Sequence, residues 1–183
     1  AAVLLAAFIA WELRTPQPML DIRYFRRRPF TGGSVAISAS FFGLFGMFFM
    51  LTQYLQLVLG HSALGAAVRT LPFALTIMLA APSSAALAAR FGTRAIVGTG
   101  LALSGAGLLI MSRSTLDTPY LLLAVALVVT AAGMGLTSAP STASIMSSLP
   151  HAKAGIGSAM NDTTRELGGA LGVAVLGSVA ASR

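Results

Sequence analysis

The sequence predicts an all-α fold, a polytopic bundle of membrane helices, and three observations support this. Of the 183 residues, 56% are hydrophobic and only 9% are charged, whereas soluble domains carry about 25% charged residues. Several apolar runs exceed the roughly 18 residues that mark a membrane-spanning helix. These runs are continuous and rich in Ala, Leu and Gly, whereas a membrane β-barrel would alternate apolar and polar residues in strands of about ten residues.

Five apolar ranges are the predicted membrane spans. The chain opens with Ala inside an apolar run, residues 1–11, which is too short to cross a bilayer. We interpret this run as the end of a preceding transmembrane helix, and the chain as a fragment of a longer protein. A polar loop, residues 12–29, follows it. The spans themselves are predicted over residues 30–59, 63–89, 95–111, 120–149 and 154–181.

The loop charges predict how the spans are oriented. Of the 12 Lys and Arg residues, eight lie on one side of the predicted membrane, namely Arg14, Arg23, Arg26, Arg27, Arg28, Arg90, Arg94 and Lys153. The opposite side holds Arg113 and Arg183, and Arg69 lies near that side within the second span. Because basic loops stay in the cytoplasm, we expect the loop of residues 12–29 to be cytoplasmic.

Several functional classes are disfavoured by the composition. The net charge is +7, but the cations lie in loops that set the topology, so no nucleic-acid partner is expected. The chain has no cysteine, which excludes disulfides and thiolate metal sites within it. His61 and His151 lie far apart, so no metal site is predicted. No nucleophile elbow, HExxH or Walker A motif is present, so we predict no catalytic residues and no enzyme.

The fifth predicted span begins with unusual polarity. Asn161 and Arg165 are four residues apart and share a helical face, and Asp162 and Glu166 form a second such pair. Because a charge near the bilayer centre costs several kcal/mol, such residues usually face a partner helix or a wet cavity. We interpret Asn161 and Arg165, with the two acids beside them, as an intramembrane polar site that faces a partner helix or a wet cavity. The alternative is a cytoplasmic helix extension, with the true span starting near Leu167.

Two further groups of polar residues are candidates for the lining of a wet pathway through the membrane. Gln53 and Gln56 are three residues apart and share a predicted face, with Tyr54 beside them. Their alternative role is an interfacial helix end with Tyr54 in the aromatic belt. Arg69 either neutralises a carboxylate at an outer mouth or anchors the interface.

Small residues in the fifth span predict close helix packing. Gly168 and Gly172 form a GxxxG pair, with Gly169 between them. Such spacing lets two helix backbones approach. A hinge role is the alternative.

Four stretches together carry a family resemblance. "PMLDIRYFRRRPF" is similar to the cytoplasmic entry of the second six-helix bundle of major facilitator superfamily transporters. "LTQYLQLVLGHSALGAAVRTLPFAL" resembles the next helix, its outer turn and the helix after it. "AARFGTRAIVGTG" resembles the second copy of the family's cytoplasmic loop motif, through Arg90, Gly92 and Arg94, although Ala89 stands where an acidic residue often precedes the arginine. "GIGSAMNDTTRELGGALGVAVLGS" resembles the penultimate helix.

The resemblance is narrowest to the fourteen-span drug:proton antiporters of the EmrB/QacA type, and it implies a function. The five spans would form the C-terminal bundle lacking its last helix, with the lipid bilayer and the missing N-terminal bundle as partners. The fifth span would border the central cavity between the bundles, so that Asn161 and Arg165 would belong to the substrate pathway, supported by ion pairs with Asp162 or Glu166. The protein would export small hydrophobic or cationic substrates across a bacterial-type plasma (inner) membrane. It would need no cofactor, since the proton gradient drives export, and the coupling residues would lie in the absent half. The alternatives are a major facilitator transporter of another small solute and a non-transporting membrane scaffold.

Overall fold

The computed structural model describes residues 7, 10–12, 14–15, 22–115 and 117–182, and these residues form helices without any strand. The prediction of an all-α fold is therefore confirmed. The elements are the short 3₁₀ helices η1 (Ile22–Arg26) and η3 (His151–Lys153), the π-helical turn η2 (Tyr54–Val58), and the α-helices α2 (Arg28–Gln53), α3 (Ala63–Arg69), α4 (Leu71–Phe91), α5 (Thr93–Met111), α6 (Tyr120–Ser147) and α7 (Ala154–Ala181).

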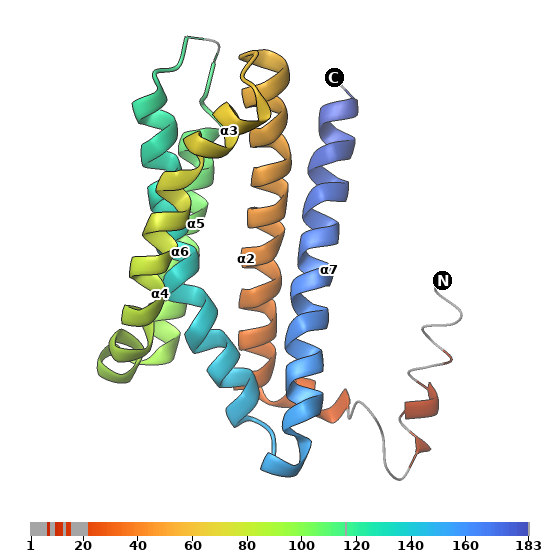
Figure 1. Ribbon diagram of the computed structural model, residues 1–183. Helices are drawn as coiled ribbons and strands as arrows, with labels where there is room; N and C mark the ends of the chain where they lie inside the picture. The colour runs from red at the N-terminus through yellow and green to blue at the C-terminus, as the bar shows by residue number, and fades with distance from the viewer. Residues whose placement is uncertain (1–6, 8–9, 13, 16–21, 116, 183) are drawn as a thin grey trace.

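The long helices α2, α4, α5, α6 and α7 stand side by side in an alternating up-and-down order (Figure 1). Two glycines with positive φ make the sharpest turns. Gly60, with φ of 69°, follows η2, and Gly92, with φ of 88°, is the only residue between α4 and α5. Glycine adopts these angles without the steric cost that a Cβ atom would add.

Four helices in the described part of the chain are long and apolar enough to cross a membrane: Arg28–Val58, Ala63–Phe91, Thr93–Met111 and Tyr120–Ser147. They correspond to the first four predicted spans within a few residues. Helix α7 has 28 residues, which is long enough, but its polar first half keeps it out of this group. Its span, like the exact extent of all five in lipid, stays a prediction. The predicted helix end at residues 1–11 lies almost entirely outside the described residues.

The helices pack in two groups that share α6. Helix α2 packs along α7, while α5 and α4 both pack along α6, and α2 also contacts α6. The largest buried apolar cluster joins α2, η2, α3, α4 and α6 and contains Met47, Leu51, Leu55, Ala66, Phe73, Leu123, Leu127, Ala131 and Met134. Below its middle, α6 runs diagonally toward α7 (Figure 1), in the part that holds the buried Pro140, which cannot donate the usual backbone hydrogen bond.

Glycines bring α2 and α7 together. A Cβ atom on Gly168 would collide with the carbonyl oxygen of Ser38, and one on Gly172 would collide with that of Phe42. Across the same interface, Ser38 Oγ donates to the carbonyl oxygen of Thr164 at 3.1 Å. The two backbones are therefore in direct contact, as small residues allow in membrane helix pairs.

The segment before α2 is tied to the turn between α6 and α7. The Arg27 Nη1 donates to the carbonyl oxygen of Ser148 at 2.8 Å, which satisfies a carbonyl at the end of α6. The ring of Tyr24, which is buried, lies 5.3 Å from the Arg27 guanidinium carbon and 5.6 Å from Lys153 Nζ. At this end of the bundle, two basic side chains therefore lie against a buried tyrosine ring.

Candidate functional site

Two helices build a polar cluster around Arg165. Asn161 and Arg165 come from α7, and Thr142 from α6. With the Asn161 amide oxygen facing the guanidinium, Oδ1 accepts from Arg165 Nε and Nη2, both at 3.3 Å, and the amide nitrogen donates to Thr142 Oγ1 at 3.2 Å. Arg165 Nη2 also donates to Thr142 Oγ1, at 3.3 Å. Asn161 is only 5% exposed and Arg165 is half-buried, so the cluster is set into the bundle.

An aromatic ring completes the surroundings of the guanidinium. The Arg165 guanidinium carbon lies 5.3 Å from the ring centroid of Phe41 on α2. A cation placed over an aromatic face is stabilised by about 0.5–2 kcal/mol, most where water is excluded. All of these partners are neutral, so they orient and solvate the positive charge without cancelling it.

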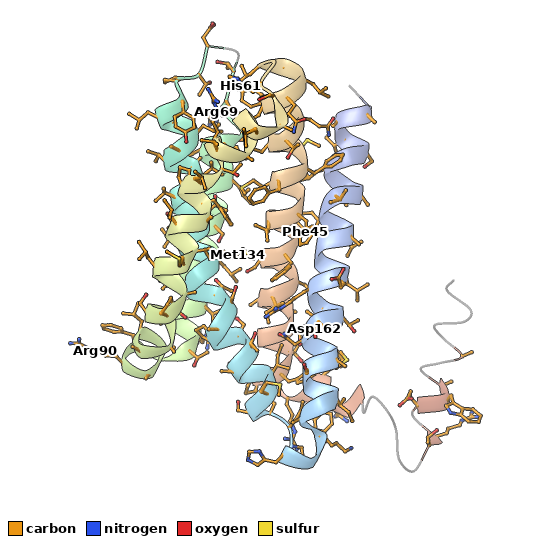
Figure 2. The ribbon with its side chains drawn as sticks, in the orientation of Figure 1. Phe45, His61, Arg69, Arg90, Met134 and Asp162 are labelled. Atoms are coloured by element: carbon orange, nitrogen blue, oxygen red, sulfur yellow. The ribbon has the colours of Figure 1, made fainter. Side chains whose placement is uncertain are left out.

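The predicted ion pairs differ from the arrangement in the structure. Asp162 and Glu166 are exposed, and Figure 2 shows Asp162 in the lower part of α7. Within the described part of the chain, no ion pair joins either acid to Arg165. The reason is that Asn161, one turn before Arg165, and Thr142, across the helix interface, draw the guanidinium toward the buried side of α7, whereas the two carboxylates project from its exposed side.

The polar group at the end of α2 lies away from this cluster. Tyr54 OH donates to the carbonyl oxygen of Thr115 at 2.7 Å, which ties η2 to the loop before α6. Gln53 and Gln56 are half-buried, and neither side chain has a hydrogen bond to a described residue. Residues Tyr54–Val58 are π-helical, with wider i→i+5 turns, so the two glutamines are not spaced as in a regular α-helix.

Arg69 links α3 to α6 at the end of the bundle opposite Arg90 (Figure 2). Its Nη1 donates to the carbonyl oxygen of Gly65 at 3.2 Å, and its guanidinium carbon lies 5.9 Å from the ring centroid of Tyr120. The Tyr120 hydroxyl donates back to the carbonyl oxygen of Arg69 at 3.2 Å. Of the predicted pathway residues, the structure therefore brings together only Asn161 and Arg165.

A separate cavity lies between α2, α5 and α6. Its volume is about 280 Å³, and its lining is mainly apolar: Ala39, Ser40, Gly43, Leu44, Leu101, Ser104, Gly105, Leu108, Thr130 and Met134. Ser40 is 7% exposed, and its hydroxyl has no hydrogen-bond partner among the described residues. None of the predicted pathway residues lines this cavity.

Comparison with known proteins decides the family. Residues 3–173 match the family model described as Major Facilitator Superfamily. The chain belongs to the Major Facilitator Superfamily. Its relatives include the multidrug efflux pump LfrA of Mycolicibacterium smegmatis, which is 36% identical over 174 residues, covering 95% of this chain and 34% of that protein.

Two other relatives match along the full chain. The multidrug resistance protein Stp of Mycobacterium tuberculosis is 33% identical over 182 residues, covering 100% of this chain and 34% of that protein. The tetracenomycin C resistance and export protein of Streptomyces glaucescens is 32% identical over 184 residues, covering 100% of this chain and 34% of that protein. This major facilitator chain therefore spans about one third of the length of these relatives.

The loop motif of this major facilitator chain lies in the turn between α4 and α5. The Arg90 guanidinium carbon is 5.3 Å from the ring centroid of Phe91, Gly92 makes the turn with its positive φ, and Arg94 is exposed. Across the described ranges of the chain, no ion pair involves either arginine. The turn is thus basic and open to the solvent or to another part of the protein.

Sequence reasoning missed two members of the Arg165 cluster. Thr142 contacts both Asn161 and Arg165, and the available signal was the polar run "STAS" near the end of an otherwise apolar span. Phe41 stands in a run of phenylalanines that looks like ordinary lipid-facing or packing sequence, and nothing in the sequence singles it out from Phe42 or Phe45.

Proposed function

We propose that this chain is part of a secondary transporter that exports drugs or other small hydrophobic molecules from a bacterial cell. The observation that carries the proposal is the half-buried cation Arg165, held by neutral partners from three helices inside an apolar bundle. A charge in such a place is costly and is usually kept for function. The printed names of the relatives, which are efflux pumps and resistance or export proteins, support the same assignment.

The proposed mechanism is alternating access. The polar cluster would contact the substrate on its way out, while the rest of the transporter supplies the other wall of the path. The close α2–α7 contact through Gly168 and Gly172 makes these two helices a unit that moves as one body. We propose that a proton gradient drives the cycle and that the protein acts as a transporter with no catalytic site, in the bacterial plasma (inner) membrane with the segment before α2 in the cytoplasm.

The test uses the intact gene product in a bacterial strain that lacks its major efflux pumps. We expect cells that express it to accumulate a neutral, apolar fluorescent dye several-fold less than cells with an empty vector. A protonophore should abolish the difference. In proteoliposomes, substrate movement should follow an imposed pH gradient. Equal accumulation with and without the protein, at a verified membrane level, would contradict the proposal.

A further inference from the structure

We propose that the Arg165 cluster binds an anionic group of the substrate, so that the exported molecules include amphipathic carboxylic acids. The inference rests on the proposed function and narrows its substrate class. It follows from the donors of the guanidinium, the charges around it and the apolar surface beside it.

The guanidinium of Arg165 is held in one orientation, and some of its N–H donors have no hydrogen-bond partner among the described residues. Arg165 Nε and Nη2 donate to Asn161 Oδ1, and Nη2 also donates to Thr142 Oγ1. Both N–H groups of Nη1 remain without a partner among the described residues. Because Asn161 is 5% exposed and fixes the other edge, these two donors are held in place before any ligand arrives. A preorganised donor set loses little entropy when it binds.

The groups that touch the guanidinium favour an anion as its ligand. The partners of Arg165 are an amide, a hydroxyl and an aromatic ring, so its positive charge is solvated but not neutralised. A carboxylate would form charge-assisted hydrogen bonds, which are about twice as strong as neutral ones. A cationic group brought against the guanidinium would instead meet a like charge whose direct partners are all neutral. The cluster thus departs from the sequence-based expectation of cationic substrates.

The helix itself could have supplied a permanent counter-ion and does not. Asp162 and Glu166 flank Arg165 on the same helix, yet both are exposed and neither pairs with it. A permanent ion pair would close the site, whereas neutral partners leave it open to a ligand that must also leave again.

Apolar surface lies beside the charge. Phe41, which carries the guanidinium over its ring, and Met160, one residue before Asn161, both pack against the buried cluster that contains Ile37 and Ile145. A ligand whose carboxylate reached Nη1 would place its apolar body on this side. The matching ligand is therefore amphipathic, with one acidic group.

The experiment uses the purified full-length transporter in nanodiscs and two matched fluorescent probes, 1-pyrenebutyric acid and 1-pyrenebutanamide. They differ only in the acidic group. We expect the wild type to bind the acid at least about tenfold more tightly than the amide, which corresponds to about 1.4 kcal/mol. Arg165→Gln should abolish this preference by weakening the acid and leaving the amide within about twofold. Arg165→Lys should keep part of it, because lysine retains the charge without the planar donor fork.

Arg113→Gln is the matched control, because Arg113 is exposed in the loop between α5 and α6. This variant should leave the affinities for both probes unchanged. Equal binding of both probes by the wild type would overturn the inference without any variant. Equal loss of both probes in a folded Arg165→Gln protein would overturn it as well, and would indicate that Arg165 pairs with an acid elsewhere in the transporter. In the cell accumulation assay, export of the neutral dye but not of the pyrene acid would contradict this inference alone. Export of neither compound would contradict the proposed function.

Discussion

At the scale of single residues, Thr142 is the side chain that makes the Arg165 cluster possible. It is the one α6 residue that receives hydrogen bonds from both Arg165 and Asn161. Without its hydroxyl, the Asn161 amide nitrogen would lose its partner in a site that is almost closed to water. The orientation of the guanidinium therefore depends on a residue that carries no charge.

We expect Thr142→Val to destabilise the intact protein by about 0.6–2 kcal/mol, the usual range for a hydrogen bond between membrane helices. Thermal unfolding in detergent measures this change. Thr163→Val is the matched control, because Thr163 is exposed on α7 and its hydroxyl bonds only to the carbonyl oxygen of Ala159 in its own helix. A control variant as unstable as Thr142→Val would contradict the assigned role of the cluster.

The sequence predicts only part of this cluster, for a physical reason. Asn161 and Arg165 contact each other because residues four apart share a helical face, and that spacing can be seen in the sequence. The contact with Thr142 depends instead on the offset of α6 along the axis of α7 and on the rotation of α6 about its own axis. The packing of both helices determines these two quantities. The ion pairs expected with Asp162 and Glu166 depend on packing in the same way, and in the described part of the chain the guanidinium contacts Asn161 and Thr142 instead.

At the scale of elements, the contact between α2 and α7 depends on glycines, which have no side chain to separate the two backbones. Gly172→Ala would drive a methyl group into the carbonyl oxygen of Phe42, which belongs to rigid backbone. We expect this substitution to cost about 1–3 kcal/mol, as overpacking of a close-packed core does, and to lower the melting temperature of the intact protein in detergent.

Gly155→Ala is the control for this prediction. Gly155 lies in the first turn of the same helix, and a Cβ atom there would meet nothing within 4 Å. Since alanine favours the helix more than glycine, this variant should be neutral or slightly more stable. If the two variants melted at the same temperature, the predicted clash of an alanine at position 172 with the backbone of α2 would be contradicted.

Helix positions are more predictable than helix faces. The long apolar runs predicted the helices to within a few residues, since the bilayer sets their length and the turn residues mark their ends. The π-helical turn at Tyr54–Val58 could not be predicted, because "YLQLV" has the composition of the helix before it. One wider turn changes the angle between the side chains along the helix, so a face predicted from α-helical spacing does not extend across it, although the helix itself was predicted.

At the scale of the whole molecule, the basic residues gather at one end of the bundle. The start of α2, the turn between α4 and α5 and the turn between α6 and α7 all lie at the lower end in Figure 1, and they carry Arg26, Arg27, Arg28, Arg90, Arg94 and Lys153. The upper end holds Arg69 and Arg113 in the part of the chain that the structure describes. This asymmetry gives the bundle a direction in the membrane, because basic loops are retained in the cytoplasm.

The orientation can be tested with two cysteine variants of the intact protein at opposite ends of α5. Thr93 begins this 19-residue helix, Thr115 follows its end, and both are exposed. At 1.5 Å per residue the helix is about 28 Å long, so it separates the two sites by most of a bilayer. In intact cells, a membrane-impermeant maleimide should label Thr115→Cys, and Thr93→Cys should react only after permeabilisation. The chain itself contains no cysteine, so labelling of the unsubstituted protein measures the background from the rest of the transporter. The reverse pattern would show that the basic end faces outward, which would contradict the proposed cytoplasmic position of the segment before α2.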